Sequence, residues 1–544
     1  MVATNTPVTR GATLPYDEYE AEAGSWGGGA TLLAVSRSIF TTGGNLTTEK
    51  SAEASGRQAV ELTGTNQYVQ WTTKNACNSI VVRLAVPDGF TGTLGVFIGA
   101  AASPQIELPV TSKYSWEYGS WTIPYSESGS VPFHIYDEAH ALLGVEVPAG
   151  TVIKLMKTSA DTAAYYTIDM VDLEEAPAAA GAPANSVVPS GADATGAADS
   201  TTALQNCINS AASGGKIAFI PAGTYRISSA LSIPAVTVQG AGMWRTTIHQ
   251  YSDTSVMRFS LNNASASVSN LLLTGEVTNR NDSATDSAFD YHGGTNSRVT
   301  NVWTEHTKCG WWVGNSGSVT SGLVISGCRF RDTYADGVNF CNGTSNSTIT
   351  NSNFRGNGDD ALASWSPSGG GVNNGNSFTW NTIQCTWRAD SIAVYGGSNF
   401  TITDNLCFDT LDQSGIMVQQ GFTSNGFSGT NNILRNTLTR CGGYFSGNYG
   451  AMHFWANQGA INGNWNVTSL DTESSTFAGF EYTGSTVNGV TVNTSVMNNS
   501  GTYGVQVTSG TGGTTTFNNS NVNGAPSGAI TTGSMTVNRV GCNF

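Results

Sequence analysis

Asp336-Gly337-Val338-Asn339-Phe340 is followed 24 residues later by Asp360-Ala361-Leu362-Ala363-Ser364, and this pattern of a polar residue, a small residue and an apolar strand recurs through the second half of the chain. Further copies begin at Asp286, Cys309, Asp390, Ser414, Gly450, Ala478, Tyr503 and Ser527. Along the chain the spacings are 23, 27, 24, 30, 24, 36, 28, 25 and 24 residues. A fixed period with insertions indicates stacked repeats. We predict a right-handed parallel β-helix in which each insertion is a loop on one rung.

A second repeated element precedes the first and alternates apolar and polar residues, as a half-buried strand does. It occurs as Val324-Ile325-Ser326, Thr348-Ile349-Thr350, Thr401-Ile402-Thr403 and Val490-Thr491-Val492. Because paired strands lie about 4.8 Å apart, equivalent residues of successive rungs should form columns.

The open end of such a stack exposes apolar residues and needs a cover. Ala203, Leu204, Cys207 and Ile208 have helical spacing, with Asp199 or Ser200 as the N-cap, and apolar strands follow. This order resembles the start of a pectate-lyase-like β-helix.

The Pro/Ala-rich stretch APAAAGAPA at 176–184 divides the chain in two. Before it, short alternating segments such as Gln67–Trp71 and Ser79–Leu84 favour an antiparallel β-sandwich. We therefore predict an all-β protein with a tail outside the folded domains (1–14), a sandwich (15–175), a linker (176–185) and a β-helix (186–544).

Composition narrows the partners. The formal net charge is −15 with only 23 Lys and Arg, which disfavours nucleic acid or pectate, and a neutral glucan makes no demand for a basic groove. Nothing suggests an organic cofactor, a membrane or an oligomer. No secretion signal is recognisable at Met1–Arg10, and we take the chain as the mature part of a secreted, extracellular protein. The nine cysteines lack C-x-x-C pairs, so a zinc site is not expected, and their pairing stays open.

Aspartates occupy one column on three consecutive rungs, at Asp336, Asp360 and Asp390, with Asp359 beside the second and Asp286 two rungs before the first. Stacked carboxylates repel one another. Later rungs place Ser, Gly, Ala and Tyr in this column, so the fold does not require aspartate there. A structural turn ladder is the alternative. Hydrolysis of a glycosidic bond needs one protonated carboxyl and one carboxylate, and crowding raises one pKa.

The stretches YADGVNFCNG (334–343), GNGDDALASW (356–365) and RADSIAVYGG (388–397) resemble glycoside hydrolase family 87, the α-1,3-glucanases and mycodextranases. The N-terminal segments ASGRQAVELT, QYVQW and NSIVVR also resemble that family's sandwich. The resemblance implies an inverting, endo-acting hydrolase of α-1,3-glucan with Asp336, Asp359 and Asp360 as catalytic residues. By analogy with polygalacturonases, Asp359 would be the acid, and Asp336 and Asp360 would activate water. Nigeran, with alternating α-1,3 and α-1,4 links, is the alternative substrate.

Sugar rings pack on aromatic side chains, and seven of the 13 tryptophans lie between Trp303 and Trp455. For each aromatic candidate, packing in the core is the alternative, and Trp311 and Trp312 should point to opposite sides of one strand. Glu305 and His306 are further candidates for the cleft. The predicted substrate-binding residues are Asp390, Trp365, Trp387, Arg388, Tyr395, Trp311, Trp312, His453 and Trp455.

YEAE (19–22) and TIDMVDLE (167–174) resemble carbohydrate-binding modules of families 6 and 35. That resemblance implies a structural Ca²⁺ held by Glu20, Glu22 and Asp169, with solvated surface carboxylates as the alternative.

Two other functions fit the same fold. A pectin hydrolase would need basic residues for uronates, but between Cys328 and Gly397 there are only Arg329, Arg331, Arg355 and Arg388. A β-helix that only binds glycans is the non-enzymatic alternative, and the Asp359-Asp360 pair beside a third aspartate argues against it.

Overall fold

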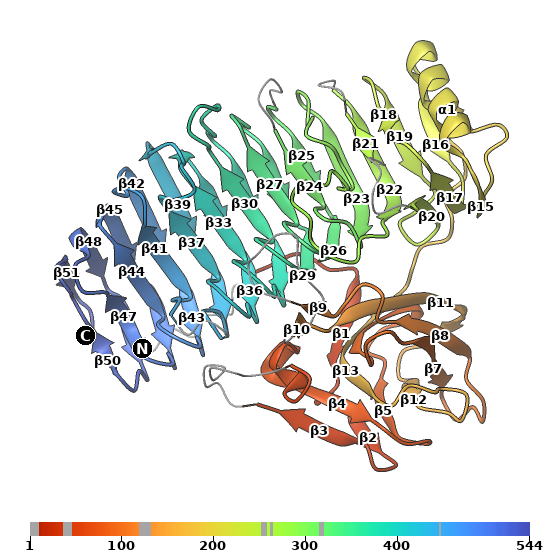
Figure 1. Cartoon of the computed structure of the whole chain (residues 1–544), viewed down its shortest axis with the longest axis horizontal. Helices are drawn as coiled ribbons and strands as arrows, with labels where there is room; N and C mark the ends of the chain where they lie inside the picture. The colour runs from red at the N-terminus through yellow and green to blue at the C-terminus, as the bar shows by residue number, and fades with distance from the viewer. Residues whose placement is uncertain are drawn as a thin grey trace.

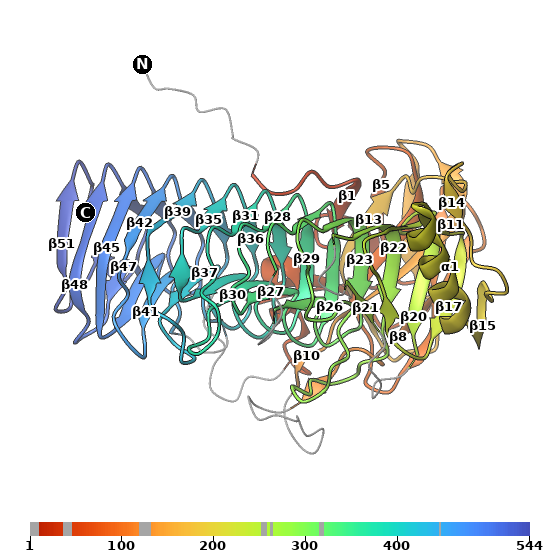
Figure 2. The same cartoon turned by 90° about the horizontal axis from the view of Figure 1, so that it is seen from above.

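The computed structural model describes residues 10–35, 46–118, 132–251, 258–261, 265–314, 320–444 and 448–544. It has two parts, an antiparallel β-sandwich and a long parallel β-helix (Figure 1). The sandwich lies along one side of the β-helix, and the rungs stack along the long axis of the molecule (Figure 2). The all-β fold predicted from the repeat is confirmed, with a solenoid of about 13 turns.

The sandwich packs two antiparallel sheets around the apolar side chains that alternate along their strands. One sheet contains β1 (Tyr16–Glu20), β3 (Thr31–Ala34), β4 (Gln58–Leu62), β6 (Cys77–Ala85), β11 (Asp137–Val147) and β13 (Tyr166–Glu174). The other contains β2 (Ser25–Gly27), β5 (Tyr68–Thr72), β7 (Thr91–Ile98), β8 (Ile106–Thr111) and β12 (Val152–Met156). Two 3₁₀ turns, Lys50–Ala52 and Ser55–Arg57, precede β4, and β9 (Glu117–Tyr118) pairs with β10 (Pro132–His134).

The β-helix has one 25-stranded sheet, which bends at each rung, and one nine-stranded sheet. The 25-stranded sheet contains β14 (Ser186–Val187), β15 (Thr195–Asp199), β16 (Ile217–Ile220), β17 (Gly223–Ile227), β19 (Thr237–Gly240), β20 (Thr246–Gln250), β22 (Ser267–Thr274), β23 (Arg298–Glu305), β25 (Val324–Ser326), β26 (Arg329–Thr333), β28 (Thr348–Thr350), β29 (Asn353–Asn357), β31 (Ser377–Thr379), β32 (Thr382–Gln384), β35 (Thr401–Thr403), β36 (Leu406–Phe408), β39 (Thr430–Leu434), β40 (Thr437–Thr439), β42 (Asn464–Thr468), β43 (Asp471–Glu473), β45 (Thr486–Asn493), β46 (Val496–Asn498), β48 (Gly512–Asn518), β49 (Asn521–Asn523) and β51 (Thr536–Val540). The nine-stranded sheet contains β24 (Trp311–Val313), β27 (Val338–Cys341), β30 (Leu362–Trp365), β33 (Ile392–Tyr395), β37 (Ile416–Gln419), β41 (Met452–Ala456), β44 (Phe480–Gly484), β47 (Tyr503–Val507) and β50 (Gly528–Ile530). Two short pairs complete it: β18 (Leu231–Ser232) with β21 (Phe259–Ser260), and β34 (Gly397–Ser398) with β38 (Phe427–Ser428).

The register of the nine-stranded sheet confirms most of the predicted repeat. Val338 pairs with Leu362, and the column continues through Ile392, Ile416 and Met452, all buried in the core. The predicted register was wrong by one residue at both ends. Phe289 pairs with Trp311, so Ser287 rather than Asp286 matches Asp336, and at the other end Val505 pairs with Ile530 rather than Ala529.

The predicted covering helix is α1 (Thr201–Gly214), and it lies over the N-terminal end of the stack (Figure 2). Leu204, Cys207 and Ile208 are buried against the first rungs. Ser200 holds the N-cap position, but its hydroxyl bonds to the Asp193 backbone and makes no capping hydrogen bond to the helix, while Asp199 accepts one from the Thr201 amide at 2.8 Å. The helix therefore closes the apolar interior at the end where the β-helix begins.

Buried charges join the sandwich to the β-helix. Arg331 of β26 donates to both oxygens of Glu138 at 2.9 and 2.6 Å, and Arg355 of β29 donates to Glu138 and, at 2.5 Å, to Asp172. All four side chains are at most 5% exposed. Arg329 likewise binds Glu174 of the sandwich at 2.6 Å. Of the four basic residues between Cys328 and Gly397, three therefore contact the sandwich, and Arg388 is the exception.

Residues on both sides of the predicted sandwich also lie against the β-helix. Arg10, expected in the tail, binds Asp471 at 2.6 Å, and the Ala12 amide donates to Thr382 at 2.9 Å. Within 176–185, the Ala176 carbonyl accepts from Arg245 and its amide donates to Asn78. All nine cysteines are free thiols, and all except Cys542 are buried. No helix among the described residues is long and apolar enough to cross a membrane.

Candidate active site

The three aspartates singled out in the sequence line one open cleft of about 550 Å³ on the nine-stranded sheet. Asp336 lies two residues before β27, and Asp360 lies two residues before β30 on the next rung, with Asp359 beside it. The Gly337 amide donates to the Asp360 carbonyl at 3.1 Å, which holds the two rungs in register. The repeat therefore brings together side chains that are 23 and 24 residues apart.

Each of these carboxyl groups has a different partner. Asp336 accepts from the Asn339 side chain at 3.0 Å, and Asp360 accepts from the Tyr395 hydroxyl at 2.8 Å. Asp359 forms an ion pair with Arg280, which also binds Asp282 at 2.7 Å. Only Asp359 of the three is held by a guanidinium group, and this separates the electrostatics of the trio.

Burial and mutual repulsion keep protons in the cluster near neutral pH. Burial, reinforced by the charge of Asp359, raises the pKa of Asp336 to about 7. Burial and the neighbouring carboxylates Asp390 and Asp359 raise the pKa of Asp360 well above its usual range. Burial also tends to raise the pKa of Asp359, but Arg280, helped by Arg388, outweighs it and leaves that pKa below the ordinary value. Near pH 7 the unliganded site thus holds an ionised Asp359 beside a protonated Asp360 and an Asp336 that is about half protonated.

Aromatic side chains wall the cleft. Trp312 and Trp365 lie edge to face, with ring centres 6.1 Å apart, and Tyr395 meets Phe422 in the same way at 5.2 Å. The Phe422 ring is 58% exposed, and its carbonyl accepts from the Trp365 indole at 3.2 Å. These rings give apolar faces beside the carboxyl groups, which is the surface that a sugar chain needs.

Several predicted binding residues lie elsewhere. Trp311 is fully buried against Phe289 in the core, whereas Trp312 faces the cleft, so this pair does point to opposite sides. Trp387 stacks on His134 of the sandwich at 4.5 Å and is fully buried. Because neither indole is exposed, a sugar cannot pack on Trp311 or Trp387 in this structure.

Asp390 is fully buried behind the cleft, where it accepts from the Ser414 amide at 2.6 Å while its own amide donates to Asp360 at 3.1 Å. In this structure its side chain therefore contacts the backbone of Ser414 and does not line the cleft. His453 and Trp455 stack on each other on β41, further along the same sheet, and neither lines the cleft. Arg388 and Tyr395 do line it.

Glu305 and His306 were expected in the cleft, and this expectation was wrong. Both are buried where the two domains meet, with Glu305 beside His140 at 3.2 Å and His306 beside Asp137 at 2.9 Å. Glu305 is the last residue of β23 and His306 follows it, at the end of the strand that meets the sandwich, and no sequence pattern indicates that contact.

The cleft also contains residues that the repeat could not identify. Arg280 and Asp282 come from the segment between β22 and β23, and Gln413, Phe422 and Thr423 come from segments flanking β37. The 36-residue spacing that follows Ser414 was the one available signal, because it marks a long insertion there. Arg280 lies in a segment that does not repeat, so the period of the sequence could not identify it.

Of the three residues proposed for calcium, Asp169 is the one that contacts a guanidinium group. Asp169 is fully buried, forms an ion pair with Arg83 and accepts from the Ser55 amide at 2.9 Å, so both its oxygens are occupied. Glu20 accepts from the Ser55 hydroxyl at 2.8 Å, and burial raises its pKa to about 9. The Arg83 guanidinium beside Asp169 disfavours a second cation at that carboxylate, whereas Glu20 Oε2 and Glu22 Oε2 are buried and accept no hydrogen bond from any residue that the structure describes. Calcium at Glu20, Glu22 and Asp169 stays a prediction.

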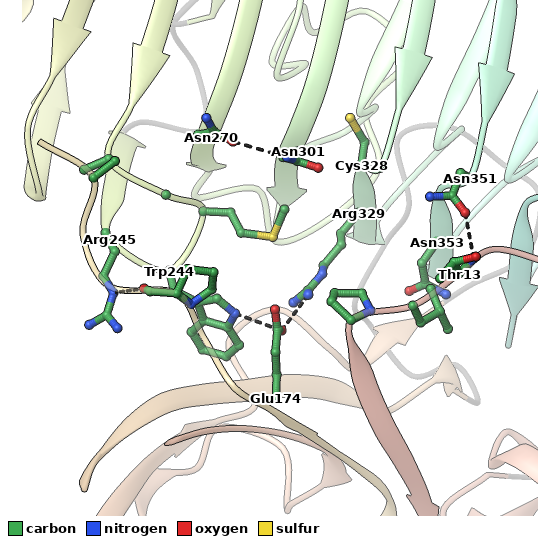
Figure 3. A pocket seen from close by; sticks show the side chains of 18 of the residues that line it. Thr13, Glu174, Trp244, Arg245, Asn270, Asn301, Cys328, Arg329, Asn351 and Asn353 are labelled. Carbon is green, nitrogen blue, oxygen red and sulfur yellow. Dashed lines mark hydrogen bonds and ion pairs between the residues drawn. The ribbon is translucent and has the colours of Figure 1, made fainter. Parts of the chain in front are cut away.

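A second cavity, of about 370 Å³, lies between the domains and is drawn in Figure 3. Its one carboxylate, Glu174, is already bound to Arg329 and, at 2.9 Å, to the Trp244 indole (Figure 3). Since glycoside hydrolysis needs two carboxyl groups, the aspartate cleft is the candidate active site and this cavity is not.

The cleft on this parallel β-helix is walled by aromatic side chains and holds clustered carboxyl groups, of which Asp359 has a lowered pKa and Asp336 and Asp360 have raised pKa values. These features are those of a glycoside hydrolase. Comparison with known proteins gives the family. The model for α-1,3-glucanase catalytic domain D1 matches residues 13–176, and that for catalytic domain D2 matches residues 194–543. This chain therefore belongs to the glycoside hydrolase family 87 α-1,3-glucanases.

Solved structures agree. The catalytic unit of a thermostable family 87 α-1,3-glucanase from Streptomyces thermodiastaticus is 32% identical, with 98% of this chain and 97% of that chain covered and a TM-score of 0.87. The Agl-KA catalytic domain is 28% identical, with 99% and 100% covered and a TM-score of 0.85. A family 87 catalytic domain in complex with nigerose is 26% identical, with 98% and 100% covered and a TM-score of 0.84. A search of curated proteins found no match.

Proposed function

We propose that this enzyme cleaves internal bonds of α-1,3-glucan with inversion, using Asp359 as general acid and Asp336 and Asp360 to activate water. The observation that carries the proposal is the placement of all three carboxyl groups in one cleft between aromatic walls. Four aspartates line the cleft, Asp282, Asp336, Asp359 and Asp360, and such a concentration of carboxyl groups would repel a uronate, so a neutral glucan fits best. Because such a polymer lies outside cells, we also propose that the protein is secreted.

The relatives support the choice of residues. Solved variants of family 87 α-1,3-glucanases each have one aspartate replaced by alanine and are described in complex with nigerose or tetrasaccharides. The three replaced aspartates consist of an adjacent pair and one that lies 23 residues before it, the spacing of Asp336, Asp359 and Asp360 here. The same arrangement on a matching fold favours the same roles.

The acid assignment requires a change at Asp359 on binding. In the free enzyme, Arg280 keeps this carboxyl ionised. A sugar that enters between the two side chains separates them, and burial then favours the protonated form. The pKa of Asp336 is about 7, so near neutral pH this residue can exchange a proton with the neighbouring Asp359.

The product configuration tests inversion. Water attacks the face opposite the leaving group, so an α-linked glucan should release β-configured reducing ends. Proton NMR during the first minutes of hydrolysis of α-1,3-glucan measures this before mutarotation. An initial α anomer would contradict inversion. The same preparation incubated with nigeran and polygalacturonate, with reducing ends as readout, decides among the three substrates.

Replacing Arg280 with glutamine tests the electrostatics. Without the guanidinium, burial dominates and the pKa of Asp359 rises, so more of the free enzyme carries the acid proton at high pH. The alkaline limb of kcat/KM, which reports the free enzyme, should move to higher pH, whereas that of kcat should move less, because substrate has already displaced Arg280. Equal shifts in both would show that Arg280 stays on Asp359 throughout the reaction. Asp282→Asn is the matched control, since it removes Arg280's other partner.

A further inference from the structure

A second cluster of ionisable side chains lies outside the cleft, where the sandwich meets the β-helix. Asp137 begins β11 of the sandwich, His306 follows β23, and Asp332 lies in β26. One ligand atom of each lies within 4.8 Å of those of the other two, and His306 Nε2 is 2.9 Å from Asp137 Oδ1. The three residues are only 3–7% exposed. They come from both domains and converge on one buried point.

Asp332 has no partner in this cluster. Both its carboxylate oxygens are buried and accept no hydrogen bond from any residue that the structure describes. Its backbone is left-handed, with φ +46°, and its side chain occupies the space above Gly356, where an added Cβ would lie 2.3 Å from Asp332 Oδ1. The chain thus holds an unsatisfied carboxylate in place, although burying one without a partner is costly.

The neighbouring charges are already committed. Glu138 binds Arg331 and Arg355, Glu305 binds His140, and His306 lies against Asp137 while its ring stacks on Tyr114 at 3.8 Å. In the described part of the chain, therefore, no arginine or lysine forms an ion pair with Asp332. A divalent cation would satisfy Asp332 and Asp137 together and would take the lone pair of a neutral His306.

We propose that Asp137, His306 and Asp332 bind a divalent transition-metal ion, with Zn²⁺ as the best fit, and that this ion joins the two domains. An imidazole ligand with two carboxylates suits zinc and its neighbours better than calcium, which prefers six to eight oxygens. This site differs from the zinc sites formed by C-x-x-C pairs, which the sequence lacks, because none of its ligands is a cysteine. The site is structural: its ligands are buried and none of them lines the cleft.

The test begins with the whole protein unfolded in chelator and refolded with or without ZnCl₂. After removal of free metal, plasma mass spectrometry should find close to one zinc per chain, and Tm should rise with the logarithm of the free Zn²⁺ concentration. Refolding with Co²⁺ should give visible absorption bands of a histidine-bound ion, and His306→Gln should abolish them. These readouts do not depend on the glucanase activity.

The stability of Asp332→Asn distinguishes metal binding from a role of Asp332 in packing alone. In chelator the variant should be at least as stable as the wild type, because it removes an uncompensated carboxyl group. In Zn²⁺ the order should reverse, since only the wild type binds the ion. Asp404→Asn is the matched control: Asp404 is also buried with a left-handed backbone, but it is paired with Arg435. The control should keep full zinc content.

Zinc content near zero in the refolded wild type, with no change in Tm, would overturn the proposal and show that Asp332 is simply protonated. Full zinc content in both Asp332→Asn and His306→Gln would also overturn it, because the ion would then lie elsewhere. If Asp332→Asn does not fold, the Co²⁺ spectra of the wild type and Asp137→Asn are compared instead. Altered or lost bands in Asp137→Asn would support the site, and an unchanged spectrum would overturn it.

Discussion

Replacing Asp336, Asp359 or Asp360 with asparagine should lower kcat on α-1,3-glucan by at least about 10²–10⁴-fold in each case, the usual contribution of a general acid or base. Asparagine keeps the size and most hydrogen bonds of the side chain but cannot transfer the proton. Asp336→Asn and Asp360→Asn should stay folded, because each loses a carboxyl group whose ionised form its neighbours repel. Asp359→Asn removes the ion pair with Arg280, but Arg280 keeps Asp282 as a partner. Reducing-end assays at saturating substrate measure the loss, and circular dichroism checks the fold.

A substrate with a good leaving group separates the roles within the trio. An α-nigerosyl fluoride needs little protonation of the departing atom, so Asp359→Asn should recover most of its rate on it. Asp336→Asn and Asp360→Asn should stay slow on both substrates, because water activation is still missing. Recovery in Asp336→Asn instead would move the acid to that residue. Asp404→Asn should behave as the wild type, and Asp390→Asn, which acts only through Asp360, should lose less.

The second large effect concerns the contact between the domains. Glu138→Gln should lower the free energy of unfolding by about 3–5 kcal/mol, because it leaves Arg331 and Arg355 buried with one partner fewer. Chemical denaturation measures the loss. Asp471→Asn is the control: its pair with Arg10 is 40% exposed on the aspartate side, and such surface pairs contribute at most about 1 kcal/mol. Equal losses in the two variants would contradict the argument.

The contact of Glu138 with Arg331 and Arg355 also predicts how the stability of the protein depends on pH. Burial tends to raise the pKa of Glu138, but the two arginines outweigh it and lower the pKa to about 2. A carboxyl group whose pKa is depressed on folding stabilises the protein above its unfolded pKa, near 4.5, and that stability is lost as the pH falls toward 2. Between pH 4.5 and 2, the difference in stability between wild type and Glu138→Gln should therefore shrink.

An isolated β-helix, without residues 1–180, should keep every residue of the aspartate cleft but should aggregate. Its contact face would expose Trp303, Trp387, Tyr334 and Leu411, which now pack with sandwich residues such as Val81 and Trp116. Exposed apolar patches of this kind promote association. Size-exclusion chromatography of the fragment checks this. A soluble, inactive fragment would show that the sandwich also shapes the cleft.

The sequence was sufficient for the β-helix and for the aspartate trio because both depend on the period of the chain. Once rungs stack at a fixed spacing, Asp336 and Asp360 must be neighbours. The direction of a side chain is less secure, since a shift of one residue turns it over, and the adjacency of Trp311 and Trp312 did not show which of the two lies in the core. Arg280 and His306 could not be placed, because one comes from a non-repeating segment and the other faces a second domain whose docking leaves no periodic trace.

The buried ion pairs between the domains have a consequence for biosynthesis. A chain emerging from the ribosome completes β13 at Glu174 long before Arg331 and Arg355 have been made. Until then Glu138 and Asp172 lack these arginine partners and stay exposed to water and salt, which screens their charges. Docking onto the growing solenoid strips away that water. Assembly of the newborn chain should therefore be sensitive to acidity and ionic strength, although the mature molecule, with these charges sealed from solvent, is far less so.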